Sequence, residues 1–193
     1  MHDARIQVHA AILAAATLGR TLVPARPDDS HQSFTWSDAH GAFVQERIDG
    51  KLQPGVRLRD LTLLLIADGV QELPLRAPDA EDLAVLARLY ESAAKILEGL
   101  RAKHDGASPV RLWPHHLDVA ILIGSIGVGF LAGDDAIDEP YWYVYNSPMP
   151  EELPPLSSGE WYRGHWTGAV LKGDPDTATI GTFLDEAIAA VRR

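Results

Sequence analysis

The chain has 193 residues, a length that fits one globular domain, 1–193, with a substantial buried core. Seventeen basic and 27 acidic residues give a formal net charge of −10, the wrong sign for binding nucleic acid or an anionic membrane surface. The absence of cysteine excludes disulfides, thiolate metal sites and a cysteine nucleophile, and it fits a cytoplasmic protein.

The first twenty residues predict an amphipathic helix near residues 4–18. Ile6, Ala10 and Leu13 recur at helical spacing and form an apolar stripe. An acidic residue, two histidines and an arginine interrupt this segment, so we interpret it as a mature helix rather than a signal sequence. Even the apolar run at residues 119–133 is too short and too rich in glycine to span a bilayer, which needs about 20 residues. We therefore expect a soluble protein.

Strand hairpins are expected next, followed by a long helix. Alternating apolar and polar residues flank a turn at residues 38–41, and Asp-Gly pairs at residues 49–50 and 68–69 mark two further turns. Asp79 is a suitable N-cap, and leucines follow it at helical spacing. This pattern predicts a helix near residues 80–104.

A second group of strands is expected from about residue 110 to residue 171. The chain then closes with a helix near residues 177–192, where isoleucine, phenylalanine and leucine define an apolar face. The predicted order is helix, strands, helix, strands, helix. Hairpins in place of βαβ alternation indicate the α+β class, with a mostly antiparallel sheet packed by about three helices.

Two adjacent histidines precede the apolar strand of the second half. With a period of two, His116 and Asp118 share one strand face and His115 lies on the other. General bases often pair an imidazole with a carboxylate, so His116 and Asp118 are candidate catalytic residues. The alternative is a structural aspartate that satisfies a nearby N–H group. Adjacent strand histidines cannot readily chelate one ion, so we predict no metal site and no cofactor.

The segment "EPYWYVYNSP" is the second candidate feature. Tyr141, Tyr143 and Tyr145 face one way, while Trp142 and Val144 face the other. Three tyrosines on one strand face offer flat apolar surface with hydroxyl groups for a small organic ligand, and ordinary cross-strand packing is the alternative. The candidate ligand-binding residues are Trp113, Tyr141, Tyr143, Tyr145, Trp161, His165 and Trp166.

Glycines separate these two features. "GSIGVGFLAGDD" lacks the Lys-Ser/Thr pair of a phosphate-binding loop, and no dinucleotide-fold pattern surrounds it. Gly127 and Gly129 share one strand face. They indicate room for a bulky cross-strand neighbour or for a ligand.

At these residues the sequence resembles an uncharacterised, mainly bacterial family described as a domain of unknown function. The resemblance rests on "LWPHHLDVA", "EPYWYVYNSPMP", "LPPL", "GAVL" and "FLDEAIAA", and it covers the chain from about residue 83 to the C-terminus. It implies a single shared domain. It brings no activity, cofactor or catalytic residue.

Three functional hypotheses follow from these patterns. The first is a small-molecule-binding protein whose aromatic-lined pocket lies in the C-terminal half, with polar contacts from His116, Asp118 and His165. The second is an enzyme of hydrolase or isomerase type that uses the His116/Asp118 pair as a general base. The third is a structural or homo-oligomer-forming protein whose exposed aromatic residues form an interface. Neither nucleic acid nor a membrane is an expected partner.

Overall fold

The computed structural model describes Arg5 and residues 34–37, 41–46, 52–57, 62–66, 70–74, 80–113 and 116–192. The first strands are β1 (Phe34–Ser37), β2 (Ala42–Glu46), β3 (Leu52–Arg57), β4 (Thr62–Ile66) and β5 (Val70–Pro74). Helix α2 (Ala80–Arg101) follows. The second group is β6 (Arg111–Trp113), β7 (Asp118–Ile123), β8 (Ile126–Leu131), β9 (Tyr141–Asn146), β10 (Glu160–Arg163) and β11 (Thr167–Lys172), and the last element is helix α3 (Thr177–Val191).

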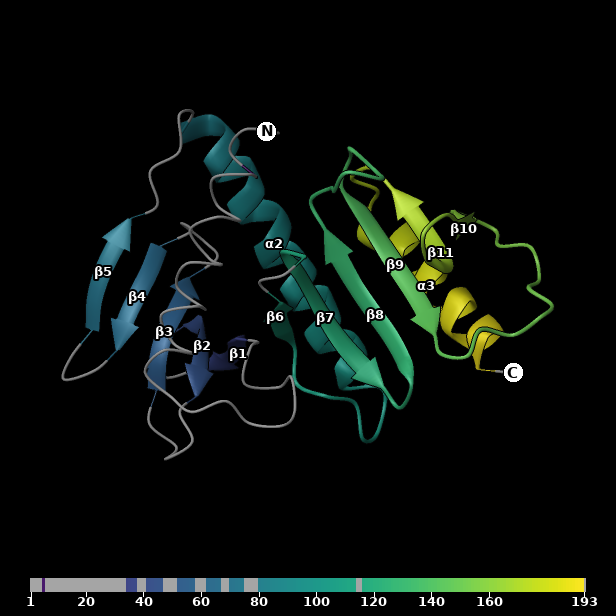
Figure 1. The fold of residues 1–193 in the computed structure, drawn as a ribbon, viewed down its shortest axis with the longest axis horizontal. Helices are drawn as coiled ribbons and strands as arrows, with labels where there is room; N and C mark the ends of the chain where they lie inside the picture. The colour runs from purple at the N-terminus through teal and green to yellow at the C-terminus, as the bar shows by residue number, and fades with distance from the viewer. Residues whose placement is uncertain are drawn as a thin grey trace.

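The described strands form one sheet of eleven strands in the order β10-β11-β9-β8-β7-β6-β1-β2-β3-β4-β5 (Figure 1). Every neighbouring pair is antiparallel. The predicted α+β class with a mostly antiparallel sheet is therefore confirmed. Strand β1 pairs with β6, with Thr35 opposite Arg111, and this pairing joins the two groups of strands into one sheet.

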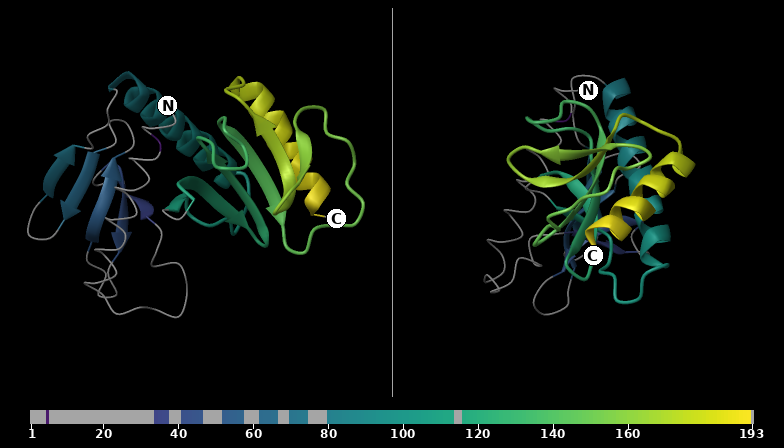
Figure 2. Two further views of the ribbon diagram at one scale, coloured as in Figure 1. Left: turned by 45° about the horizontal axis from the view of Figure 1, so that its top comes forward. Right: turned by 90° about the vertical axis from the view of Figure 1, so that its right-hand side faces the viewer.

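Helices α2 and α3 lie on the same face of the sheet (Figure 2). In α2, Leu86, Tyr90 and Leu97 recur at helical spacing and are almost fully buried against β7 and β8. Helix α3 begins at the N-cap Asp176, whose side chain accepts a 2.8 Å hydrogen bond from the Thr179 backbone N–H. The two helices end close to the predicted limits, because their apolar stripes stop there.

The described residues contain two helices rather than the expected three. The predicted first helix, near residues 4–18, lies outside the described residues except for Arg5, whose backbone is helical. The predicted N-cap Asp79 also lies outside them. Among the described residues, neither helix combines the length and apolar character needed to cross a bilayer.

The two faces of the sheet carry separate apolar clusters. The larger cluster lies between the sheet and the helices and includes Leu86, Val119, Trp142 and Phe183. The smaller cluster lies on the opposite face, around Tyr141, Tyr143 and Val170, with Trp113, Tyr162 and Trp166 packed against it. Alternation along β7 and β9 separates the two sets of side chains. A cavity adjoins the smaller cluster, on the face opposite the helices.

Candidate functional site

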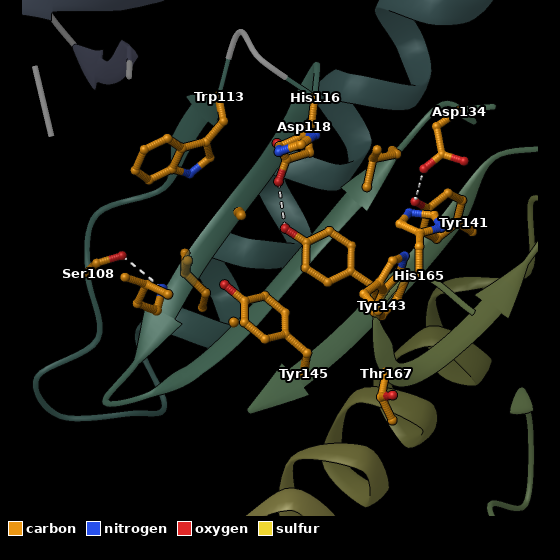
Figure 3. Close-up of a pocket in the computed structure, with 16 residues that line it drawn as sticks. Ser108, Trp113, His116, Asp118, Asp134, Tyr141, Tyr143, Tyr145, His165 and Thr167 are labelled. Carbon is orange, nitrogen blue, oxygen red and sulfur yellow. Dashed lines mark hydrogen bonds between the residues drawn. The ribbon is translucent and has the colours of Figure 1, made fainter. Parts of the chain in front are cut away.

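A cavity of about 680 Å³ opens on the face of β6 to β9 that the helices do not cover (Figure 3). Its lining residues are Ser108, Trp113, His116, Asp118, Ala120, Ile121, Leu122, Gly127, Leu131, Asp134, Tyr141, Tyr143, Tyr145, His165, Trp166 and Thr167. Eight of the nine candidate residues lie in this wall. Sequence reasoning did not identify the polar lining residues Ser108, Asp134 and Thr167 as candidates, although Asp134 belongs to the quoted glycine-rich segment "GSIGVGFLAGDD".

Asp118 is the buried carboxylate of this cavity. Asp118 is the first residue of β7 and is only 5% exposed. The Tyr143 hydroxyl donates a 2.5 Å hydrogen bond to Asp118 Oδ2. The other oxygen, Oδ1, is buried with no hydrogen-bond partner among the described residues. A buried carboxylate with an open acceptor is costly unless a donor or a positive charge reaches it.

Tyr143 reaches Asp118 by crossing a whole strand. Gly129 of β8 pairs with Tyr143 of β9 on one side and with Ala120 of β7 on the other. A Cβ atom at Gly129 would lie 2.5 Å from the Tyr143 hydroxyl oxygen, so only glycine leaves the space that the ring occupies. The predicted role of Gly129, room for a bulky cross-strand neighbour, is confirmed.

Tyr145 repeats this arrangement two residues further along β9. It pairs with Gly127, where an added Cβ atom would collide with its ring. The Tyr143 and Tyr145 rings lie side by side and nearly parallel, with centroids 6.0 Å apart and planes at 26°. Trp166 contacts Tyr143 edge-on at 6.2 Å. The rings and the glycine backbone together make a flat aromatic floor for the cavity.

Tyr141 closes the far end of the floor. Its hydroxyl donates a 2.7 Å hydrogen bond to Asp134 Oδ2, and Asp134 Oδ1 accepts bonds from the Ala136 and Ile137 amides. Partial burial of Asp134 raises its pKa, but these hydrogen bonds outweigh it and hold the pKa below its ordinary value. Asp134 is therefore an ionised carboxylate whose oxygens are already satisfied.

The turn before Asp118 differs from the expected continuous strand. Leu117 has a φ of +55°, a left-handed conformation that is strained for leucine. The Tyr90 hydroxyl on α2 donates a 2.6 Å hydrogen bond to the Leu117 carbonyl and holds this reversal in place. His116 thus lies in an exposed turn at the rim of the cavity, next to Asp118 in Figure 3. The hydrogen-bond partner of Asp118 is Tyr143, whereas the sequence suggested His116; His115 lies outside the described residues.

Trp161, one of the candidate ligand-binding residues, does not line this cavity. Strand β10 pairs Trp161 with Ala169, which belongs to the helix-side cluster, so Trp161 lies on that face as well. Its indole N–H donates a 2.7 Å hydrogen bond to the Pro154 carbonyl. Its neighbour Tyr162 lies on the cavity face and packs against Trp166.

Comparison with protein-family models, with curated proteins and with solved structures gave no match for this chain. The resemblance to a bacterial family of unknown function therefore stays a prediction. Within the part of the chain that the structure describes, no three His, Asp or Glu side chains are grouped to hold a metal ion.

The burial of Asp118 predicts a pH-dependent stability. Burial raises its pKa from 3.8 to about 6, while the Tyr143 hydrogen bond and the charge of His116 oppose the rise. The folded state thus holds this proton more tightly than the unfolded state, so its stabilising contribution is present below about pH 4 and is lost as the pH rises through about 6.

The difference in unfolding free energy between Asp118→Asn and the parent should therefore change with pH. As the pH rises from 4 to 7, it should shift by about 2 to 3 kcal/mol in favour of the variant. Urea denaturation at a series of pH values measures this difference. Asp185→Asn, an exposed change on α3, is the control and should show a flat difference. An equally flat difference for Asp118→Asn would contradict the raised pKa.

Proposed function

We propose that the protein binds a small organic molecule in the cavity over the aromatic floor. The observation that supports this most directly is the buried Asp118 carboxylate, whose Oδ1 has no partner among the described residues in a cavity otherwise lined mainly by aromatic and aliphatic groups. Small-molecule sites combine such apolar walls with a few fixed polar groups and have volumes of about 300 to 1,000 Å³. The 680 Å³ cavity lies within this range.

The test is a thermal-shift screen against aromatic and aliphatic metabolites, followed by titration of every ligand found. We expect a ligand to bind Asp118→Asn at least tenfold more weakly than the parent, because the variant keeps the side-chain shape and loses the charge. Asp185→Asn should bind like the parent. A screen whose ligands all bind Asp118→Asn and the parent equally would refute binding at this site.

An enzyme with Asp118 as general base is the second candidate, favoured by the position of a carboxyl group with a pKa of about 6 in a cavity wall. His116 lies on the same wall and is the neighbour that would complete the predicted pair. For this candidate, turnover found in a substrate screen should rise with pH through about 6. The Asp118→Asn variant should then lose turnover and retain substrate binding.

A further inference from the structure

The charges around the cavity are unbalanced. Its lining includes two carboxylates, Asp118 and Asp134, and two histidines, His116 and His165, but no lysine or arginine among the described residues. Arg111 on β6 is not part of this lining, but it lies on the same sheet face as Trp113, with its guanidinium carbon 6.0 Å from the centre of the Trp113 ring. The whole chain carries a formal net charge of −10. A cation approaching the cavity is therefore attracted, and an anion is repelled.

The two carboxylates differ in what they can still bind. The oxygens of Asp134 already accept bonds from Tyr141 and from two backbone amides. Asp118 receives one bond, from Tyr143, and its second oxygen has no partner among the described residues. Asp118 is therefore the group that gains most from a ligand that brings N–H donors and a positive charge.

The aromatic floor favours the same ligand. Figure 3 shows the Tyr143 and Tyr145 rings side by side beneath the cavity, with their faces turned toward it. Trp166 adds a third ring beside Tyr143. The face of an aromatic ring carries partial negative charge and attracts organic cations, and proteins recognise quaternary ammonium ligands with such ring faces.

We propose that the ligand is an organic cation, a protonated amine attached to a flat or apolar group. Its ammonium group pairs with the Asp118 carboxylate, and its apolar part lies over Tyr143 and Tyr145. This inference rests on the proposed function, since it assigns the class of ligand to the same cavity.

Three probes with the same phenol ring test the charge alone. Tyramine carries a primary ammonium group, tyrosol carries a hydroxyl in its place, and 4-hydroxyphenylacetate carries a carboxylate. We expect calorimetric titration at pH 7.5 and low salt to show tyramine binding at least tenfold more tightly than tyrosol. The carboxylate should bind more weakly than tyrosol. Raising the salt concentration should weaken the binding of tyramine and leave the binding of tyrosol unchanged.

Two variants test whether the preference for tyramine over tyrosol depends on the Asp118 carboxylate. Asp118→Asn should remove the advantage of tyramine over tyrosol while tyrosol binds within twofold of the parent. Asp185→Asn, on the opposite face of the sheet, should keep the full advantage. Retention of the advantage in Asp118→Asn would overturn the assignment of the cation to this carboxylate.

The failure of this inference differs from the failure of the proposed function. If tyrosol or 4-hydroxyphenylacetate binds as tightly as tyramine or more tightly, the ligand is not an organic cation, although the cavity can still be a binding site. No tyramine binding at millimolar concentration also overturns the inference, whatever the metabolite screen finds. The proposed function fails separately, when no ligand from that screen loses affinity on Asp118→Asn.

Discussion

Phe183→Ala is expected to lower the free energy of unfolding by about 3 to 5 kcal/mol. Phe183 lies on α3 with no exposed surface, in the cluster between this helix and the sheet. Truncation removes apolar contacts and leaves a cavity that rigid strands cannot close. Leu86→Ala, at an equally buried position on α2, should cost about 2 to 5 kcal/mol.

Urea denaturation followed by circular dichroism measures both losses. Ser92→Ala on α2 and Asp185→Ala on α3 are exposed changes on the same helices and should stay within about 0.5 kcal/mol of the parent. A loss below 1 kcal/mol for either core variant would contradict the arrangement of helices on one face of the sheet.

Gly129→Ala should cost about 2 to 4 kcal/mol, as overpacking and a broken buried hydrogen bond add together. The new methyl group would collide with the Tyr143 hydroxyl, which is buried and donates a hydrogen bond to Asp118. The ring cannot move away without breaking its hydrogen bond to that carboxylate.

Gly127→Ala is the matched comparison. Its methyl group would also collide with a tyrosine ring, that of Tyr145. Tyr145 is 38% exposed and can swing into solvent, so the expected cost is below about 1 kcal/mol. Denaturation curves for the two variants give the comparison, and equal costs would show that the Tyr143 to Asp118 contact contributes little.

Local periodicity predicted much of this fold. Alternation in β9 correctly divided Tyr141, Tyr143 and Tyr145 from Trp142 and Val144, because a strand allows only two directions for its side chains. The leucine spacing of α2 and the apolar face of α3 likewise predicted two helices that pack on the sheet, whereas their position on the same face is known only from the structure. These patterns depend on neighbours in the chain and can be read without knowing the sheet.

The contacts that shape the site depend on strand order, which the sequence does not display. Tyr143 and Asp118 are 25 residues apart and meet only because β8 lies between their strands with a glycine at the crossing. Trp161 was expected in the pocket wall, but it lies on the helix-side face of the sheet, because that face is set by its pairing with Ala169. Periodicity also gave no warning of the reversal at Leu117, which a hydrogen bond from a distant helix maintains.

The crossing of Tyr143 over Gly129 constrains how this sequence can change over generations. A larger residue at position 129 displaces the ring, while a smaller residue at position 143 leaves a groove above the glycine and an aspartate without its donor. A chain that carries only one of these two changes is less stable than the parent. The two positions are therefore free to vary mainly as a pair, and homologous chains that alter one should carry a compensating change at the other.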